Sequence, residues 1–184
     1  MEEIEGLTES AEENIHHGAH SGPSWASWVA LSTAILAAFA AVAALLSGWN
    51  ANEAMLHQLG ASDHWSYYQA KGIKAAIVET RSDIFVAAGK PADPALAEKL
   101  EKYKHEQEEI SNEAKALEHE RTVEMKRHET FSKAVTFFQV AIAISAISIL
   151  AKRRRYWLIS LAFGVIGLGF LAFGLIQQYF GHSA

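Results

Sequence analysis

The stretch WASWVALSTAILAAFAAVAALLSG, residues Trp25 to Gly48, decides the fold because it contains no Asp, Glu, Lys, Arg or His. A helix rises about 1.5 Å per residue, so a stretch of this length can cross a hydrocarbon core about 30 Å thick. It starts too late in the chain, after too many acidic residues, to be a cleavable signal peptide. We therefore expect a membrane-spanning helix at 25–48 that stays in place as an anchor.

Two further segments have the same character. Residues 134–151 carry no charge, Phe131 lengthens this apolar segment to 131–151, and residues 156–180 are also free of charge. Aromatic side chains are favoured where lipid meets water. Such side chains lie at the ends of the three segments: Trp25, Trp28, Trp49, Tyr156, Trp157 and Tyr179. The sequence thus predicts three transmembrane helices.

The basic residues predict the orientation in the membrane. Lysine and arginine in short loops stay in the cytoplasm. The turn at 152–155, between the second and third spans, reads KRRR: Lys152, Arg153, Arg154 and Arg155. We expect this turn and the N-terminus to be cytoplasmic in a bacterial inner membrane, with residues 49–130 and the C-terminus outside the cytoplasm. Lys126, Arg127 and Lys133, at the other end of the second span, favour the opposite orientation.

Residues 49–130 separate the first two spans and are rich in charge. Their one strong break is GKPADP, Gly89 to Pro94, and Gly together with Pro is typical of a turn. Strong helix formers follow this turn. We expect two long helices that run away from the membrane and back, paired as an antiparallel coiled coil. The predicted fold class is all-α, with three spans and this hairpin between the first and the second.

A heptad spacing selects one side of each helix as the seam of that coiled coil. On the outgoing helix it selects Leu56, Leu59, Asp63, Ser66, Ala70, Ile73, Ile77, Thr80 and Ile84. On the returning helix it selects Leu96, Leu100, Tyr103, Gln107, Ile110, Ala114, Leu117, Arg121, Glu124 and His128. Folding about the turn pairs residues whose numbers add to 183 or 184. This register predicts an ion pair between Asp63 and Arg121 that specifies the alignment of the two helices.

The opposite face of the outgoing helix is also apolar or small. Its residues are Ala61, Trp65, Tyr68, Gly72 and Ala75. A helix that is apolar on two faces is normally buried between neighbours, and exposed aromatic patches mark contact sites. We predict an interface between copies here, with the outgoing helices inside a ring or bundle. Two alternatives stay open: Trp65 and Tyr68 fold back over their own hairpin, or they stack on a ligand.

Nine histidines suggest a metal site. The predicted register brings His64 near His119, with carboxylates beside them, and His with carboxylate is a zinc-binding combination. A second His-rich tract lies in residues 1–24, an acidic segment that we expect to be a disordered tail. Its histidines are His16, His17 and His20. Inward-facing helical pairs of histidine and carboxylate are missing, so solvated histidines are the default and metal binding is a weaker hypothesis.

Other classes of function find little support. No ionisable residue lies within the three charge-free segments, which argues against a carrier of charged substrates. A phosphate loop, a nucleophile elbow and a basic nucleic-acid patch are missing, and the net charge is −5. We expect neither an enzyme nor a cofactor, and no nucleic-acid partner.

The sequence favours a self-associating structural or accessory subunit of a membrane assembly. Its partners would be the lipid bilayer, copies of itself and another protein of a membrane complex. A membrane-tethered metal-binding or sensor module and a channel or transporter component are the alternatives.

Several stretches together resemble one family. They are the run ANEAMLHQLGASDHWSYYQAKGIK (Ala51 to Lys74), the start of the first span (Trp28 to Ala34), the entry to the second (His128 to Ile147) and the basic turn. With these stretches the chain resembles bacterial domain-of-unknown-function family 4337 over nearly its whole length. The resemblance implies a bacterial membrane protein with an acidic, His-bearing N-terminal tail. It implies no activity, cofactor or catalytic residue.

Overall fold

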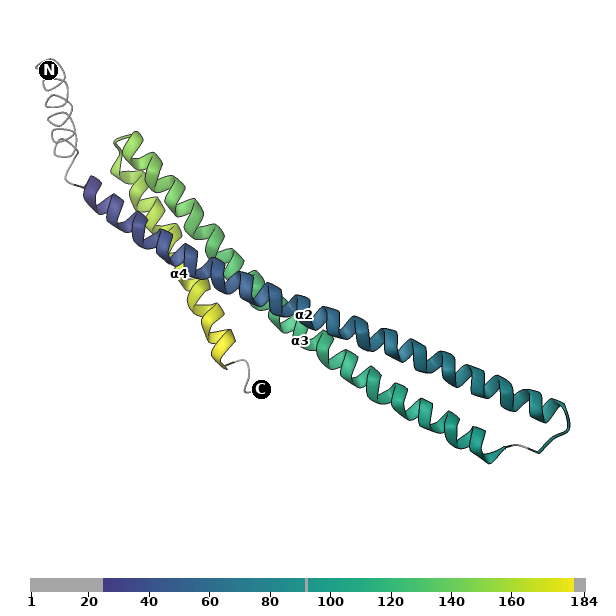
Figure 1. Cartoon of the computed structure of the whole chain (residues 1–184). Coiled ribbons are helices and arrows are strands. Elements are labelled where there is room, and N and C mark those ends of the chain that lie inside the picture. Colours follow the sequence, from purple (N-terminus) through teal and green to yellow (C-terminus); the bar gives the residue numbers. More distant parts are fainter. Residues whose placement is uncertain (1–24, 92, 181–184) are drawn as a thin grey trace, which may run out of the picture. The chain divides into compact units, whose positions relative to one another are not determined.

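The computed structural model describes residues 25–91 and 93–180, and this part of the chain is helical without any strand. Its helices are α2 (Ala26–Ala87), α3 (Pro94–Leu150) and α4 (Arg154–Phe180) (Figure 1). The all-α prediction is confirmed for the described residues. The predicted tail at 1–24, with its three histidines, lies outside them.

Each of the three helices is long and apolar enough to cross a membrane. These segments belong to the three spans that the sequence predicts. The first two spans do not end where their apolar residues end. Both continue without a break into the charged residues that follow or precede them, giving helices of 62 and 57 residues.

The turn between α2 and α3 lies where the sequence predicts it. Gly89 has a φ of +70°, in the left-handed region that favours glycine. Its N–H donates to the carbonyl oxygen of Val86 at 3.0 Å, and the N–H of Lys90 donates to that of Phe85 at 3.0 Å. This pair of bonds satisfies the last carbonyls of α2 in a Schellman motif.

The start of α3 is capped by its own sequence. The carboxylate of Asp93 accepts a hydrogen bond from the N–H of Ala95 at 3.0 Å. Proline follows directly as the first helical residue, where its missing N–H costs nothing.

The turn between α3 and α4 repeats the motif with a different residue. Lys152 has a φ of +50°, and its N–H donates to the carbonyl oxygen of Ile149 at 3.1 Å. The N–H of Arg153 donates to that of Ser148 at 3.1 Å. The chain thus places a lysine, within the KRRR turn, at a position that glycine would fill without strain.

By its contacts the chain divides into two units, which we name by composition. The apolar unit comprises residues 25–44 and 132–176, and the charged unit comprises residues 45–131 and 177–180 of the described chain. Helix α2 and helix α3 each contribute to both units. We describe each unit by itself.

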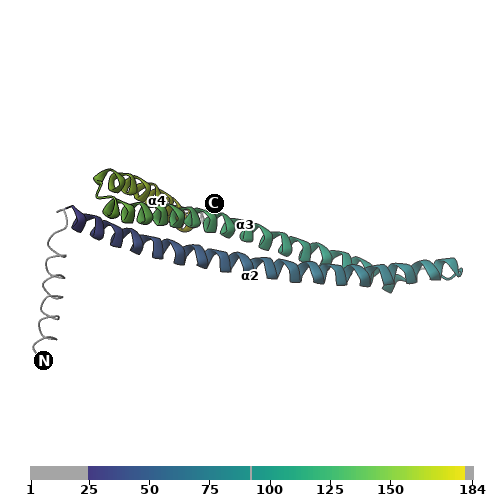
Figure 2. The same cartoon turned by 90° about the horizontal axis from the view of Figure 1, so that it is seen from above.

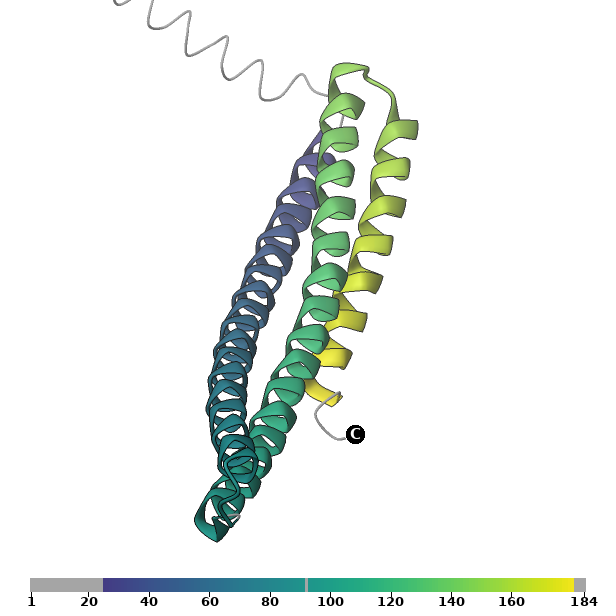
Figure 3. The same ribbon diagram turned by 90° about the vertical axis from the view of Figure 1, so that its right-hand side faces the viewer.

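In the apolar unit three helices pack through small and polar residues. Helices α3 and α4 lie side by side (Figure 3), and the hydroxyl of Ser160 on α4 donates to the carbonyl oxygen of Ala141 on α3 at 2.7 Å. The indole N–H of Trp157 donates to the hydroxyl of Ser32 at 3.1 Å, which joins α4 to α2. The fully buried Phe138 of α3 packs against α2 and α4. These hydrogen bonds satisfy polar groups that an apolar surrounding would otherwise leave unpaired.

In the charged unit α2 and α3 lie side by side and antiparallel (Figures 1 and 2). The core between them is thin and made mostly of small residues. It contains Ala54, Ala61, Ala75 and Val78 of α2 with Leu96, Ile110 and Ala114 of α3. Small side chains let the two backbones approach closely, so polar side chains beside the core can bridge the helices.

Candidate functional site

One ion pair and two histidine–carboxylate contacts bridge α2 and α3 in the charged unit. His57 pairs with Glu120 at 3.1 Å, His64 with Glu113 at 3.2 Å, and Lys71 with Glu106 at 2.5 Å. The residue numbers of every pair add to 177, and successive pairs are seven residues apart on both helices. We call these six residues the ladder. Its regular spacing sets the register of the two helices.

Lys71 is the most closely held member of the ladder. Besides its ion pair, its ammonium nitrogen lies 5.1 Å from the ring centroid of Tyr67 and 5.5 Å from that of Tyr103. The hydrogen bond that Lys71 donates to the carboxylate of Glu106 raises the pKa of Lys71 and lowers the pKa of Glu106. One cation is therefore held between a carboxylate and two aromatic faces, one from each helix.

The aromatic residues of α2 complete this cluster. The indole N–H of Trp65 donates to the carboxylate of Glu118 at 2.8 Å, and its ring meets that of Tyr68 edge to face at 5.5 Å. The side-chain amide of Gln107 donates to the carbonyl oxygen of Tyr68 at 3.3 Å. This amide fits because residue 72 is glycine: a Cβ there would lie 2.8 Å from its nitrogen. Trp65 and Tyr68 therefore contact the returning helix of their own chain.

The helix faces predicted to form the seam agree with the structure on α3 but not on α2. All ten residues of the predicted seam on α3 are buried or half-buried. On α2 the assignment is wrong, because the face predicted to point outward is the one that meets α3. Ala61 and Ala75 are buried, and Trp65, Tyr68 and Gly72 are half-buried. The residues predicted to form a contact between copies thus lie on a face of α2 that α3 already covers.

The predicted seam of α2 is instead exposed along its whole length. Its five large aliphatic side chains are between 58% and 64% exposed. They are Leu56, Leu59, Ile73, Ile77 and Ile84. We call these five residues the α2 stripe. Within the charged unit they lie away from the core that α2 shares with α3.

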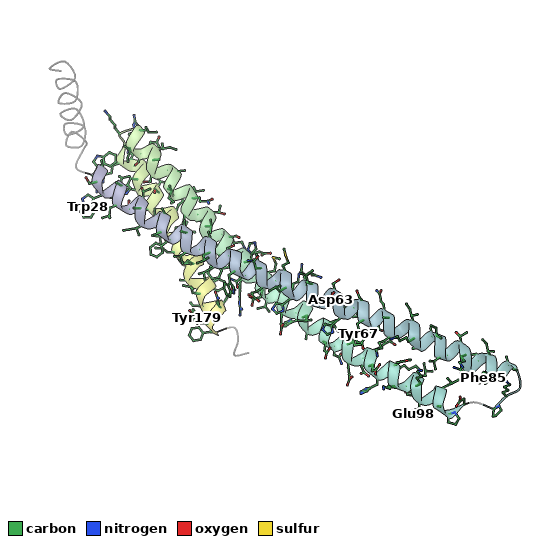
Figure 4. The ribbon with its side chains drawn as sticks, viewed as in Figure 1. Trp28, Asp63, Tyr67, Phe85, Glu98 and Tyr179 are labelled. Carbon is green, nitrogen blue, oxygen red and sulfur yellow. The ribbon has the colours of Figure 1, made fainter. Side chains whose placement is uncertain are left out.

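The structure does not bring Asp63 and Arg121 together. Asp63 lies on the exposed side of α2, labelled in Figure 4, while Arg121 is half-buried on α3. No ion pair joins them in the described part of the chain. The reason is the register: the expected pairing differs from that of the ladder by six or seven in residue number. In the register of the ladder, alanines pack between the two helices and three side chains of α2 each reach a glutamate of α3.

The candidate metal ligands are separated by the same change of register. The ring of His64 pairs with Glu113, and His119 is exposed on α3. Among the described residues no group of three or more His, Asp or Glu side chains is arranged to hold a metal ion. His16, His17 and His20 lie outside the described residues.

A second polar cluster was not anticipated as a site. Among the described residues Arg127 is the one charged residue that is buried. Its guanidinium donates to the carboxylate of Glu124 at 2.6 Å and to the backbone carbonyl of Gln177 at 3.2 Å, so it joins α3 to the end of α4. Nearby in sequence, the hydroxyl of Ser47 lies 3.0 Å from the ring of His128. In the sequence, Arg127 contributed only to the predicted orientation. Its position beside the end of a span was the feature that could have indicated a buried polar cluster.

Both the ladder and the Arg127 cluster hold neighbouring helices in position. The ladder and the Arg127 cluster consist of ion pairs and hydrogen bonds whose members engage one another. The basic turn residues Lys152, Arg153, Arg154 and Arg155 are exposed. The exposed large apolar residues of the charged unit include the α2 stripe.

Comparison with known proteins agrees with the resemblance of the sequence. No curated protein and no solved structure matches the chain significantly. The model of a family described as "Domain of unknown function (DUF4337)" matches residues 25–177, which is more than half of the chain. The protein therefore belongs to the DUF4337 family.

Proposed function

We propose that this protein is a non-enzymatic, three-span protein of the bacterial inner membrane that associates with copies of itself as a structural or accessory subunit. The observation that carries the proposal is the α2 stripe. In place of the aromatic face, which α3 covers, the stripe is the contact surface. Lipid would cover the exposed apolar residues of the spans, but it would not reach residues that lie beyond the membrane.

The arrangement in the membrane follows from the same residues. Three helices have the length and composition to span, and the KRRR turn favours a cytoplasmic position for the loop between the last two. In this topology residues 49–130 form a helical hairpin outside the cytoplasm. The seven-residue spacing of the ladder supports a coiled coil within that hairpin.

The size of the stripe argues for a partner. Burying a leucine or isoleucine side chain completely is worth about 1.5–3 kcal/mol. Five such side chains, each more than half exposed, would therefore leave several kcal/mol unrealised if water surrounded them. Asp63, Ser66 and Ala70 separate Leu59 from Ile73, so the stripe consists of two apolar groups, and exposed apolar groups on a surface outside the membrane are typical of contact sites.

The test is a matched pair of substitutions in the full chain. We expect Ile73→Gln combined with Ile77→Gln to reduce the assembly to smaller species, measured by native gel electrophoresis of detergent extracts. Val86→Gln is the control, because Val86 is 59% exposed on the same helix but does not belong to the stripe. An assembly of unchanged size in the double variant would refute the proposed contact surface. Helix content by circular dichroism should be equal in all three proteins.

A further inference from the structure

We propose that the α2 helices of neighbouring copies pair in parallel and in register, so that each residue of the stripe meets its own counterpart. This inference rests on the proposed self-association and adds its geometry. The occupant of the stripe is a second copy of this chain. Asp63, which lies between Leu59 and Ile73 on the same exposed side of α2, then shares one layer with Asp63 of the next copy.

The heptad positions of α2 support an extended contact. A heptad repeat has two core positions. Leu56, Ala70, Ile77 and Ile84 occupy the first, and Leu59 and Ile73 occupy the second. This heptad frame can be extended toward the start of α2. It reaches Trp28, Ile35, Val42 and Trp49 at the first position and Leu31 and Leu45 at the second. Each of these six is a large apolar residue that is also exposed. The frame thus includes some of the exposed apolar residues of α2, whereas Phe39, Met55, Tyr67 and Val86 are exposed outside it.

The ladder explains why the residues of the stripe stay on one side of α2 along its length. A straight α-helix drifts by about 20° for every seven residues relative to a strict heptad repeat. His57, His64 and Lys71 are seven apart, yet each reaches a glutamate on α3. The contact of α2 with α3 therefore follows the heptad and not the straight helix. Residues spaced by seven on the other side of α2 consequently stay aligned as well.

The size of the surface indicates how far the contact extends. The segment 56–84 is about 43 Å long, and a helix presents a strip about 10 Å wide, so it offers roughly 400 Å². A stable interface buries about 800 Å² on each partner. The segment therefore offers about half of that area. A second copy in the same membrane can add contacts between its own spans, which a partner without spans lacks.

Membrane topology then sets the direction. All copies of one protein insert with the same orientation, so every α2 leaves the bilayer on the same side. Two such helices that touch along their length run parallel. The antiparallel alternative, which would pair Leu56 with Ile84 about a centre at Ala70, requires copies with opposite orientation.

The absence of cysteine from the sequence permits a clean test by single substitution. Leu56→Cys, Ala70→Cys and Ile84→Cys place a thiol at the same heptad position at three heights, about 21 Å apart. Ala116→Cys, on the exposed side of α3, is the control. Each variant is oxidised in native membrane vesicles, and the disulfide-linked dimer is measured by non-reducing gel electrophoresis.

In the parallel arrangement all three α2 variants form a dimer several-fold above the Ala116→Cys control. Dimer at Ala70→Cys alone would show an antiparallel contact and overturn the inference. Absence of dimer in all three, in a chain that still migrates as a multimer, would overturn it while leaving self-association intact. A monomeric chain would refute the proposed function itself. Asp63→Asn adds an independent readout: removing the like charges from one layer should increase the multimeric fraction, and an unchanged fraction would place Asp63 outside the contact.

Discussion

Gly167 and Gly169 lie two residues apart on α4 in different surroundings. A Cβ at Gly167 would lie 2.9 Å from the ring of Phe138, which is fully buried and stacks on Phe39. A Cβ at Gly169 would have no described atom within 4 Å apart from those of its own stretch of helix. We expect Gly167→Ala to destabilise the chain by about 1–3 kcal/mol through overpacking. Gly169→Ala should stabilise it by about 0.5–1 kcal/mol, because alanine restricts the unfolded chain. Unfolding midpoints in one detergent compare the two, and equal shifts would contradict the packing described for α4.

The ion pair of Lys71 and Glu106 predicts how stability depends on pH. The pKa of Glu106 is lowered from 4.5, so its contribution is present above that pH and is lost as pH falls through the lowered pKa. The pKa of Lys71 is raised from 10.5, so its contribution is present below that pH and is lost as pH rises through the raised pKa. Wild type should therefore exceed Lys71→Met in unfolding midpoint most strongly at neutral pH. The difference should shrink in strong acid and strong base, and a constant difference would contradict the pairing.

At the scale of single elements, the turns were the most predictable features. Glycine at position 89 follows the end of α2, and proline at position 94 is the first residue of α3. The KRRR turn was located by its charge and by the apolar segments on either side. Local chemistry decides such positions, and that chemistry is visible in the sequence.

The faces of the helices were less predictable. Helix α3 has one apolar face outside its span, and the sequence identified it correctly. Helix α2 has two, one of large aliphatic residues and one of small and aromatic residues. Periodicity alone cannot decide which of two apolar faces meets a given neighbour. The choice depends on the register, and the ladder that accompanies this register is formed by residues of both helices together.

The two turns offer a reciprocal test of the left-handed positions. Gly89→Ala should destabilise the chain by about 1 kcal/mol, because a residue with a Cβ is strained at a φ of +70°. Lys152→Gly should stabilise it by up to about 1 kcal/mol, because it relieves the strain at a φ of +50°. Thermal unfolding followed by circular dichroism checks both. If Lys152→Gly destabilised the chain, the lysine side chain would contribute more to stability than the strain of its left-handed backbone removes.

At the scale of the whole molecule, the proposed orientation can be tested with the same cysteine-free chain. Lys90→Cys, in the turn between α2 and α3, should react with a membrane-impermeant maleimide in intact spheroplasts. Lys152→Cys, in the KRRR turn, should react only after the membrane is opened, because basic short loops stay in the cytoplasm. The reverse pattern would show that Lys126, Arg127 and Lys133 determine the orientation.

The central claim is that copies of this chain associate, and the most direct measurement is the mass of the native protein. Wild-type chain is extracted from its own membrane into lipid nanodiscs, and particle masses are measured with and without prior crosslinking. The account predicts a discrete multimer in both samples. A monomer in both would contradict self-association and would mean that the α2 stripe meets a different protein.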